Sequence, residues 1–247
     1  MKITNQMIFK MIVSMTLLGL SQLSVASSTN NSHNQHLVEH GAQIYQVTKF
    51  TNEWSLNKDS QGTFGSSLES LIGTDENRLF VNANFNKGES HQPNYNVSTL
   101  YSRNVADFWD IQAGLKYQAE RNNSDSQRIN AVIGVLGLAP YFFETKAYLY
   151  AGQYGFLGAS VELERDFLLT QKLITQPYVD AEFIFRDQAK EASKLGLSEL
   201  QTGIKTRYEI NKRIRPFVDV AYAYEKGKKG TTVEKGWRYG LGVELVF

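Results

Sequence analysis

The sequence predicts an all-β protein, a transmembrane antiparallel β-barrel of ten to twelve strands that is preceded by a cleaved signal peptide and a short flexible arm. Three observations predict this fold. The first residues have the layout of an export signal. The rest of the chain consists of segments in which apolar and polar residues alternate strictly. Tight turns and longer polar loops connect these segments alternately, which is the asymmetry that outer-membrane barrels show.

Residues 1–26 predict the signal peptide. Lysines accompany the short apolar run Met11 to Leu20, and Ser24, Val25 and Ala26 form a cleavage site of the small-x-small type. The run is shorter than the ~20 residues that a membrane-spanning helix requires. We therefore expect cleavage after Ala26 and leave residues 1–26 out of the fold.

Residues 27–41, "SSTNNSHNQHLVEHG", predict a flexible periplasmic arm. This stretch is polar and offers little apolar surface to bury, so no packed structure is expected of it. The barrel is expected to occupy residues 42–247.

Alternating segments follow the arm, with no convincing amphipathic helix among them. In the final segment, large apolar residues stand at every second position, which places them on one face of a strand and the polar residues on the other. Seven segments are clear: 109–119, 141–151, 157–163, 173–185, 200–210, 218–224 and 237–247. Three are weaker: 78–87, 95–103 and 128–138. These make ten strands, and a hairpin of poor alternation at 44–56 and 63–72 makes twelve.

The connections between the segments separate a membrane barrel from a soluble β-sandwich. Tight turns such as "NVADF", "GLAP", "LTQK" and "INKRI" alternate with the longer loops "NKGESHQPN", "RNNSDS", "RDQAKEASK" and "EKGKKGTTVEKG". An outer-membrane barrel has short turns in the periplasm and longer loops outside, whereas a sandwich needs no such asymmetry. The alternative is a soluble protein whose apolar faces meet in a core. It is less favoured because it does not explain why an export signal and the turn asymmetry occur together. We therefore expect contact with the lipid of a bacterial outer membrane.

The composition of the expected mature chain excludes some classes of function. The four methionines all lie before Ala26 and the sequence has no cysteine, so the mature chain has no sulfur ligand and no disulfide framework. Without Lys2 and Lys10 it has 24 basic and 25 acidic residues. This balance argues against nucleic-acid binding, which requires a clustered basic excess.

The polar faces of the strands predict a charged barrel interior with an acidic excess. Charges inside a narrow barrel must pair with one another or line an ion path. Two interpretations therefore remain open, a salt-bridged plug that keeps the barrel rigid and an electronegative conduit that concentrates cations. The lumen-lining residues we expect are Asp110, Lys116, Glu144, Lys146, Lys205, Arg207, Glu209, Asp219, Arg238 and Glu244.

Two clusters are candidate metal ligands. Glu162 and Glu164 are one strand from Asp180 and Glu182 across a tight turn, so these four carboxylates are expected at similar depth, as a weak and transient cation site. Carboxylates are hard ligands and do not select Cu(I). In the arm, His33, His36 and His40 have spacings of three and four residues, which place them on one face if the arm orders around a metal. The alternative is that these histidines are simply solvated.

The sequence argues against an enzyme. Outer-membrane hydrolases need a nucleophile or an activated water with a general base, most often histidine. His91 is the one histidine of the barrel region, and its neighbour Ser90 would point the opposite way on a strand. A structural or adhesive barrel whose loops are the working surface remains the alternative to metal handling.

Five stretches carry a resemblance to a known family: "LYSRNVADFWDIQAGLKY", "GLAPYFFETKAYLY", "LLTQKLITQPYVDAE", "LSELQTGIKTRYEINKRIRPFV" and "WRYGLGVELVF". They resemble the copper resistance protein B family of outer-membrane proteins over about Glu53 to Phe247. The resemblance implies an outer-membrane β-barrel of copper resistance or homeostasis, with copper as its metal and a periplasmic copper-handling protein as a candidate partner. Family members typically carry a segment rich in Met and His ahead of the barrel, whereas this arm has three histidines and no methionine.

We therefore expect an outer-membrane barrel that binds copper ions or lets them cross the membrane through an acidic lumen.

Overall fold

The computed structural model describes residues 44–247 except 90–92, 121–122, 190–191, 193 and 227–232. The described part of the chain forms twelve long strands and one short strand. Their bounds are β1 Tyr45–Leu56, β2 Gly62–Gly73, β3 Asn77–Gly88, β4 Asn94–Ala106, β5 Trp109–Glu120, β6 Asn123–Ala139, β7 Phe143–Gly152, β8 Phe156–Glu164, β9 Phe167–Leu168, β10 Leu173–Arg186, β11 Gly196–Tyr208, β12 Ile214–Glu225 and β13 Glu234–Val246. Two single 3-10 turns, Pro140–Phe142 and Gln153–Gly155, complete the secondary structure of this part.

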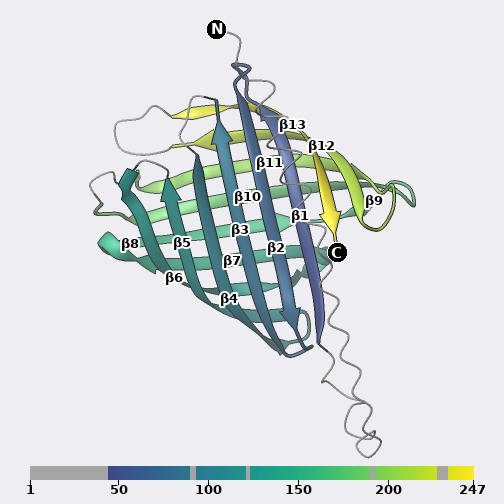
Figure 1. The fold of residues 1–247 in the computed structure, drawn as a ribbon, viewed down its shortest axis with the longest axis horizontal. Coiled ribbons are helices and arrows are strands. Elements are labelled where there is room, and N and C mark those ends of the chain that lie inside the picture. Colours follow the sequence, from purple (N-terminus) through teal and green to yellow (C-terminus); the bar gives the residue numbers. More distant parts are fainter. Residues whose placement is uncertain (1–43, 90–92, 121–122, 190–191, 193, 227–232) are drawn as a thin grey trace, which may run out of the picture. The chain divides into compact units, whose positions relative to one another are not determined.

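The twelve long strands close into one antiparallel barrel. Each strand pairs with its neighbours in sequence, and β13 pairs back with β1, from Lys49 opposite Val246 to Leu56 opposite Tyr239. In Figure 1 the wall that contains β1 to β3 crosses the wall that contains β7 and β10. Closure removes the free edges that an open sheet would present, so each of the twelve long strands has a partner on both sides.

The predicted alternation is confirmed, and its apolar face lies on the outside. On β5 the side chains of Ile111 and Leu115 are exposed on the outer surface, whereas Asp110 and Gln112 are buried in the lumen. Leu241 in the middle of β13 is 65% exposed. A soluble protein would hide such residues, while a barrel in an outer membrane turns them toward lipid and keeps its polar residues inside. The protein is therefore an outer-membrane β-barrel.

The structure contains the two strands that were hardest to recognise. The hairpin of poor alternation is present as β1 and β2, so the strand number is at the upper end of the predicted range. The predicted strand at 141–151 begins later, because Tyr141 and Phe142 have positive φ and form a turn. Residues 123–126, predicted to be loop, belong to β6 instead.

The connection from β8 to β10 is a hairpin with a break. After Glu164 the ladder is interrupted at Arg165 and Asp166, and then β9 resumes the pairing with β10, with Leu168 opposite Ile174. The tight turn predicted at "LTQK" therefore closes this hairpin, with the amides of Leu169 and Thr170 bonded to the carbonyl of Leu173.

The connections fall on two rims, which we call inner and outer. The inner rim carries the turns 74–76, 107–108, 140–142, 169–172 and 209–213, and the outer rim carries the rest. By the rule for outer-membrane barrels, the inner rim faces the periplasm. The asymmetry is weaker than predicted, because the outer connections 57–61 and 153–155 are also short. Among the described residues there is no helix with the length and apolarity needed to cross a membrane.

Candidate functional site: an acidic cavity inside the barrel

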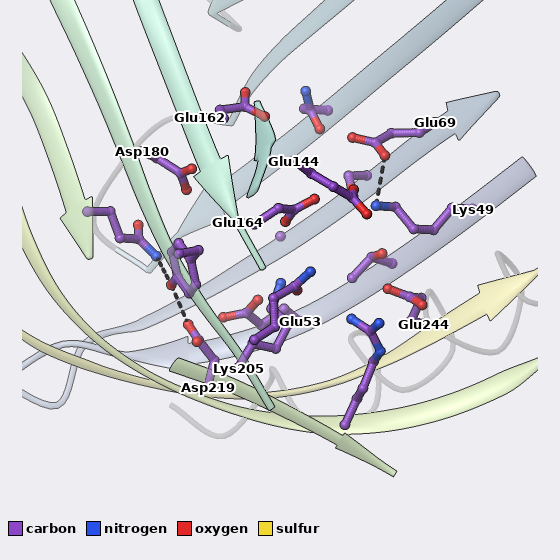
Figure 2. Close-up of a pocket in the computed structure, with 18 of the residues that line it drawn as sticks. Lys49, Glu53, Glu69, Glu144, Glu162, Glu164, Asp180, Lys205, Asp219 and Glu244 are labelled. Atoms are coloured by element: carbon purple, nitrogen blue, oxygen red, sulfur yellow. Dashed lines mark hydrogen bonds and ion pairs between the residues drawn. The ribbon is translucent and has the colours of Figure 1, made fainter. Parts of the chain in front are cut away.

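The lumen contains a cavity of about 390 Å³. Inward residues of β1, β2, β3, β7, β8 and β10 to β13 line it, so it touches every part of the wall except β4 to β6. Figure 2 shows the carboxylates of Glu53, Glu144, Glu164 and Asp180 converging on it from different strands. Period-two alternation explains this arrangement, because every second side chain of each strand must point inward.

The cavity has an excess of negative charge. Its lining includes nine carboxylates and five basic side chains. The carboxylates belong to Glu53, Glu69, Glu144, Glu162, Glu164, Asp166, Asp180, Asp219 and Glu244, and the basic groups to Lys49, Lys146, Lys205, Arg207 and Arg215. Within the described part of the chain, five of these carboxylates form no ion pair, namely Glu53, Glu144, Glu164, Asp180 and Asp219. A cavity of one dominant sign, enclosed by a wall of low dielectric constant, attracts ions of the opposite sign.

Three of the four carboxylates predicted as a cation site line this cavity. Glu162 lies directly opposite Asp180 in the β8–β10 ladder, and Glu164 lies opposite Glu144 in the β7–β8 ladder. Glu182 is not in the lining, because it stands opposite Ser160, one inward position closer to the outer rim. In the described residues, no group of three or more His, Asp or Glu side chains is close enough to hold a metal ion.

A chain of ion pairs crosses the lumen. Lys146 Nζ on β7 lies 3.1 Å from Glu162 Oε2 on the neighbouring β8 and 3.4 Å from Glu69 Oε1 on β2. Glu69 Oε2 in turn lies 2.8 Å from Lys49 Nζ on β1. The four side chains thus connect the wall of β1 and β2 with the wall of β7 and β8.

A second network holds the wall of β10 to β12. The hydroxyl of Tyr178 donates to Asp219 Oδ2 at 2.8 Å and accepts from Gln201 Nε2 at 2.7 Å. The ammonium of Lys205 lies over the ring of Tyr178, 5.8 Å from its centroid. Asp219 Oδ1 is buried and has no hydrogen-bond partner in the described structure.

Two arginines that line the cavity near the inner rim are each paired. Arg207 pairs with Asp166, which stands in the break between β8 and β9. Arg215 joins Glu209 at 2.9 Å and Glu244 at 3.1 Å. Glu209 itself follows β11 in the inner turn and is not in the cavity lining.

The other residues predicted in the lumen lie away from the large cavity. Asp110 is buried at the inner end of β5, where it pairs with Arg78 at 3.1 Å. Lys116 lines a second, smaller cavity of about 90 Å³ and lies over the ring of Tyr150. Arg238 pairs with Glu225 at 3.3 Å, close to the outer rim.

A row of glutamates near the outer rim did not follow from the sequence pattern. Glu182, Glu199, Glu225 and Glu234 stand directly opposite one another on the successive strands β10, β11, β12 and β13. Residues directly opposite in an antiparallel pair point to the same face, so all four point into the lumen. Only the register of four strands reveals this row, and the β-bulge next to Glu182 alters that register.

Lys49, Glu53 and Asp166 were also missed as site residues. The positions of Lys49, Thr51 and Glu53 at every second residue were a readable signal for an inward face. Asp166 carried no such signal because it lies outside the strands. The histidines His33, His36 and His40, together with the predicted signal peptide and arm, lie outside the described residues, as does His91.

Comparison with protein families and known proteins gives a consistent result. The family model described as "Copper resistance protein B precursor (CopB)" matches residues 44–246. The protein named copper resistance protein B from Escherichia coli is 28% identical over 193 residues, 78% of this chain and 64% of that protein. The copper resistance protein B homolog of Pseudomonas syringae pv. tomato (strain ATCC BAA-871 / DC3000) is 26% identical over 197 residues, 80% of this chain and 66% of that protein. The chain thus matches just under two thirds of the length of each relative.

Solved structures share the barrel at very low sequence identity. The NanC porin superimposes with a TM-score of 0.56 at 10% identity, over 80% of this chain and 98% of that chain. The KdgM porin gives a TM-score of 0.53 at 10% identity, over 81% of this chain and 99% of that chain. At this level of identity the likeness concerns the fold alone.

Proposed function

Since the chain belongs to the copper resistance protein B family, we propose that it serves copper resistance from the outer membrane and that copper ions are bound in transit in its acidic cavity. The observation that carries this proposal is the excess of carboxylates in an enclosed lumen, five of them without an ion pair in the described structure. The role is one of ion handling and involves no catalysis.

The chemistry of the cavity suits brief binding rather than storage. Carboxylate oxygens bind Cu²⁺ without selecting it strongly, and no preformed cluster of three ligands gathers among the described residues. An ion that must leave again needs a site of this weak kind. An ion released at the inner rim would pass to a periplasmic copper-handling protein.

Selectivity for copper then has to come from better ligands than carboxylates. Imidazole is such a ligand, and His33, His36 and His40 precede the barrel at spacings suited to a shared metal. We assign these three residues to copper capture as part of the same proposal.

Copper tolerance and copper accumulation of a deletion strain test the proposal. The wild-type gene is expected to restore tolerance, whereas Glu164→Gln combined with Asp180→Asn is expected to restore little of it, because two unpaired carboxylates of the cavity are lost. The matched control is Asp75→Asn combined with Asp107→Asn, which removes the same charge from exposed inner turns. Replacement of His33, His36 and His40 by Ala measures how much the arm contributes to copper tolerance.

The outcomes separate the alternatives. Full tolerance with the cavity variant would remove the cavity from copper handling. Unchanged copper tolerance and copper content in the deletion strain itself would favour a structural or adhesive barrel without a metal role.

A further inference from the structure

The two cavities of the lumen meet at one pair of charged side chains. The large acidic cavity touches no residue of β4 to β6, and the smaller cavity touches only β3 to β8. The residues that line both are Asn84, Lys146 and Glu162. The ion pair of Lys146 and Glu162 therefore stands where the two spaces adjoin.

The same lysine also reaches across the barrel. Its ammonium contacts Glu69 on β2, which is five strands from β7 around the closed sheet, while holding Glu162 on the adjacent strand. Figure 2 shows Glu69 and Glu162 approaching from different strands, with Glu69 bonded to Lys49. The side chain of Lys146 is 17% exposed, so these contacts enclose it.

Glu69 and Glu162 would be left in different environments if Lys146 withdrew. Glu69 retains Lys49 as a second basic partner at 2.8 Å, and Glu162 faces Asp180 across the β8–β10 ladder. Lysine carries a point charge on a flexible stem of four carbons, and unlike arginine it makes no rigid two-pronged contact. Withdrawal of Lys146 would therefore leave Glu69 paired and would free Glu162 for another cation.

We propose that Lys146 is the movable barrier of the lumen, a tethered cation that closes the path between the two cavities at rest and opens it when its ammonium leaves Glu69 and Glu162. The open path is selective for cations, because carboxylates of the large cavity and amide side chains of the smaller one line it. The barrier would keep the lumen closed at rest. It rests on the proposed function, in which ions enter the lumen.

Planar lipid bilayers that contain the refolded full-length protein test the barrier in KCl, without copper. Lys146→Met is expected to raise the single-channel conductance by about twofold or more and to shift the reversal potential in a KCl gradient toward cation selectivity. Lys146→Arg keeps the charge between Glu69 and Glu162 and is expected to stay near the wild-type conductance. Glu69→Gln breaks the bridge from the other wall and is expected to raise conductance as well.

Lys116→Met is the matched control. It removes one positive charge from the smaller cavity, where Lys116 lies over the ring of Tyr150, 4.6 Å from its centroid, and forms no ion pair in the described structure. An increase in conductance with Lys116→Met equal to that with Lys146→Met would overturn the inference, as would unchanged conductance in both Lys146→Met and Glu69→Gln.

This measurement distinguishes the barrier from the proposed function. Conductance in KCl reports the closure whatever ion the protein serves in the cell, whereas copper tolerance of cells reports the metal role. A higher KCl conductance of Lys146→Met, together with unchanged copper tolerance of the deletion strain, would leave the inference intact and contradict the proposed function.

Discussion

At the scale of single residues, buried polar side chains hold the inner surface of the wall together. Asp110 accepts hydrogen bonds from Ser102 at 2.8 Å and from Asn104 at 3.1 Å, and it pairs with Arg78. Ser102 accepts in turn from Gln112, which accepts from the hydroxyl of Tyr148 at 2.6 Å. One continuous network therefore joins β3, β4, β5 and β7.

We expect Asp110→Asn to lower the free energy of unfolding by about 1–3 kcal/mol, because Arg78 loses the charge that satisfies it in a poorly solvated site. Urea unfolding in lipid vesicles, followed by tryptophan fluorescence, measures the change. The control is Asp107→Asn, which removes the same charge from the exposed turn that precedes β5. Equal stability of the two variants would show that the network contributes little.

Glycines of the closing strand make room for large inward side chains. A Cβ at Gly240 would collide with the carboxylate of Glu53, and a Cβ at Gly242 would collide with the ring of Phe217. Gly242 is therefore required by packing inside the lumen, because backbone and a ring stand against it, whereas a side chain at Gly240 would require the flexible carboxylate of Glu53 to shift.

At the scale of strands, the row of glutamates across β10 to β13 is an arrangement that opposes stability. Like charges directly opposite in an antiparallel ladder repel each other. Of the four residues, Glu225 has an ion pair with Arg238 in the described structure. Repulsion of this kind is retained in proteins where a site needs the charge, and the row lies where an ion would enter from the outer rim.

Neutralising one member of the row is expected to stabilise the barrel. Glu199→Gln removes repulsion toward Glu182 and Glu225, worth about 0.2–1 kcal/mol for each pair. The gain should shrink as salt screens the charges. Glu244→Gln serves as the contrasting control, because Glu244 is paired with Arg215 and its loss is expected to destabilise. Destabilisation by Glu199→Gln at low salt would contradict this reading of the row.

The strands show how far local pattern carries a prediction. Alternation identified the inward faces of β5, β8, β10 and β13, because side chains on a strand point to opposite sides whatever the strand pairs with. The break at Asp166 and the turn at Tyr141 escaped it, since a ladder interruption depends on local geometry and not on period. The contact of Lys146 with Glu69 could not be read from the sequence, because it depends on strand number and stagger in the closed barrel.

At the scale of the whole molecule, the surrounding lipid decides which substitutions the outer surface tolerates. Leu241→Arg in the middle of β13 is expected to cost about 2–4 kcal/mol, because the charge would face the hydrocarbon core of the membrane. In a soluble protein a residue this exposed could be changed at almost no cost.

Ile214→Arg supplies the depth control. Ile214 is also exposed on the outer surface but is the first residue of β12, at the inner rim, where an arginine should cost about 0–1 kcal/mol. Guanidinium unfolding of both variants in vesicles compares the two positions. Equal costs would mean that the apolar band does not lie in the hydrocarbon.

The seam between β1 and β13 also has a kinetic consequence. It joins residues as distant as Lys49 and Val246, so the pairing that completes the cylinder is among the least local contacts in the chain. Contacts of such long range form slowly, and until they form both terminal strands expose unsatisfied amides and carbonyls that invite misassembly. Pairing of β1 with β13 is therefore the step at which a folding catalyst would accelerate assembly most.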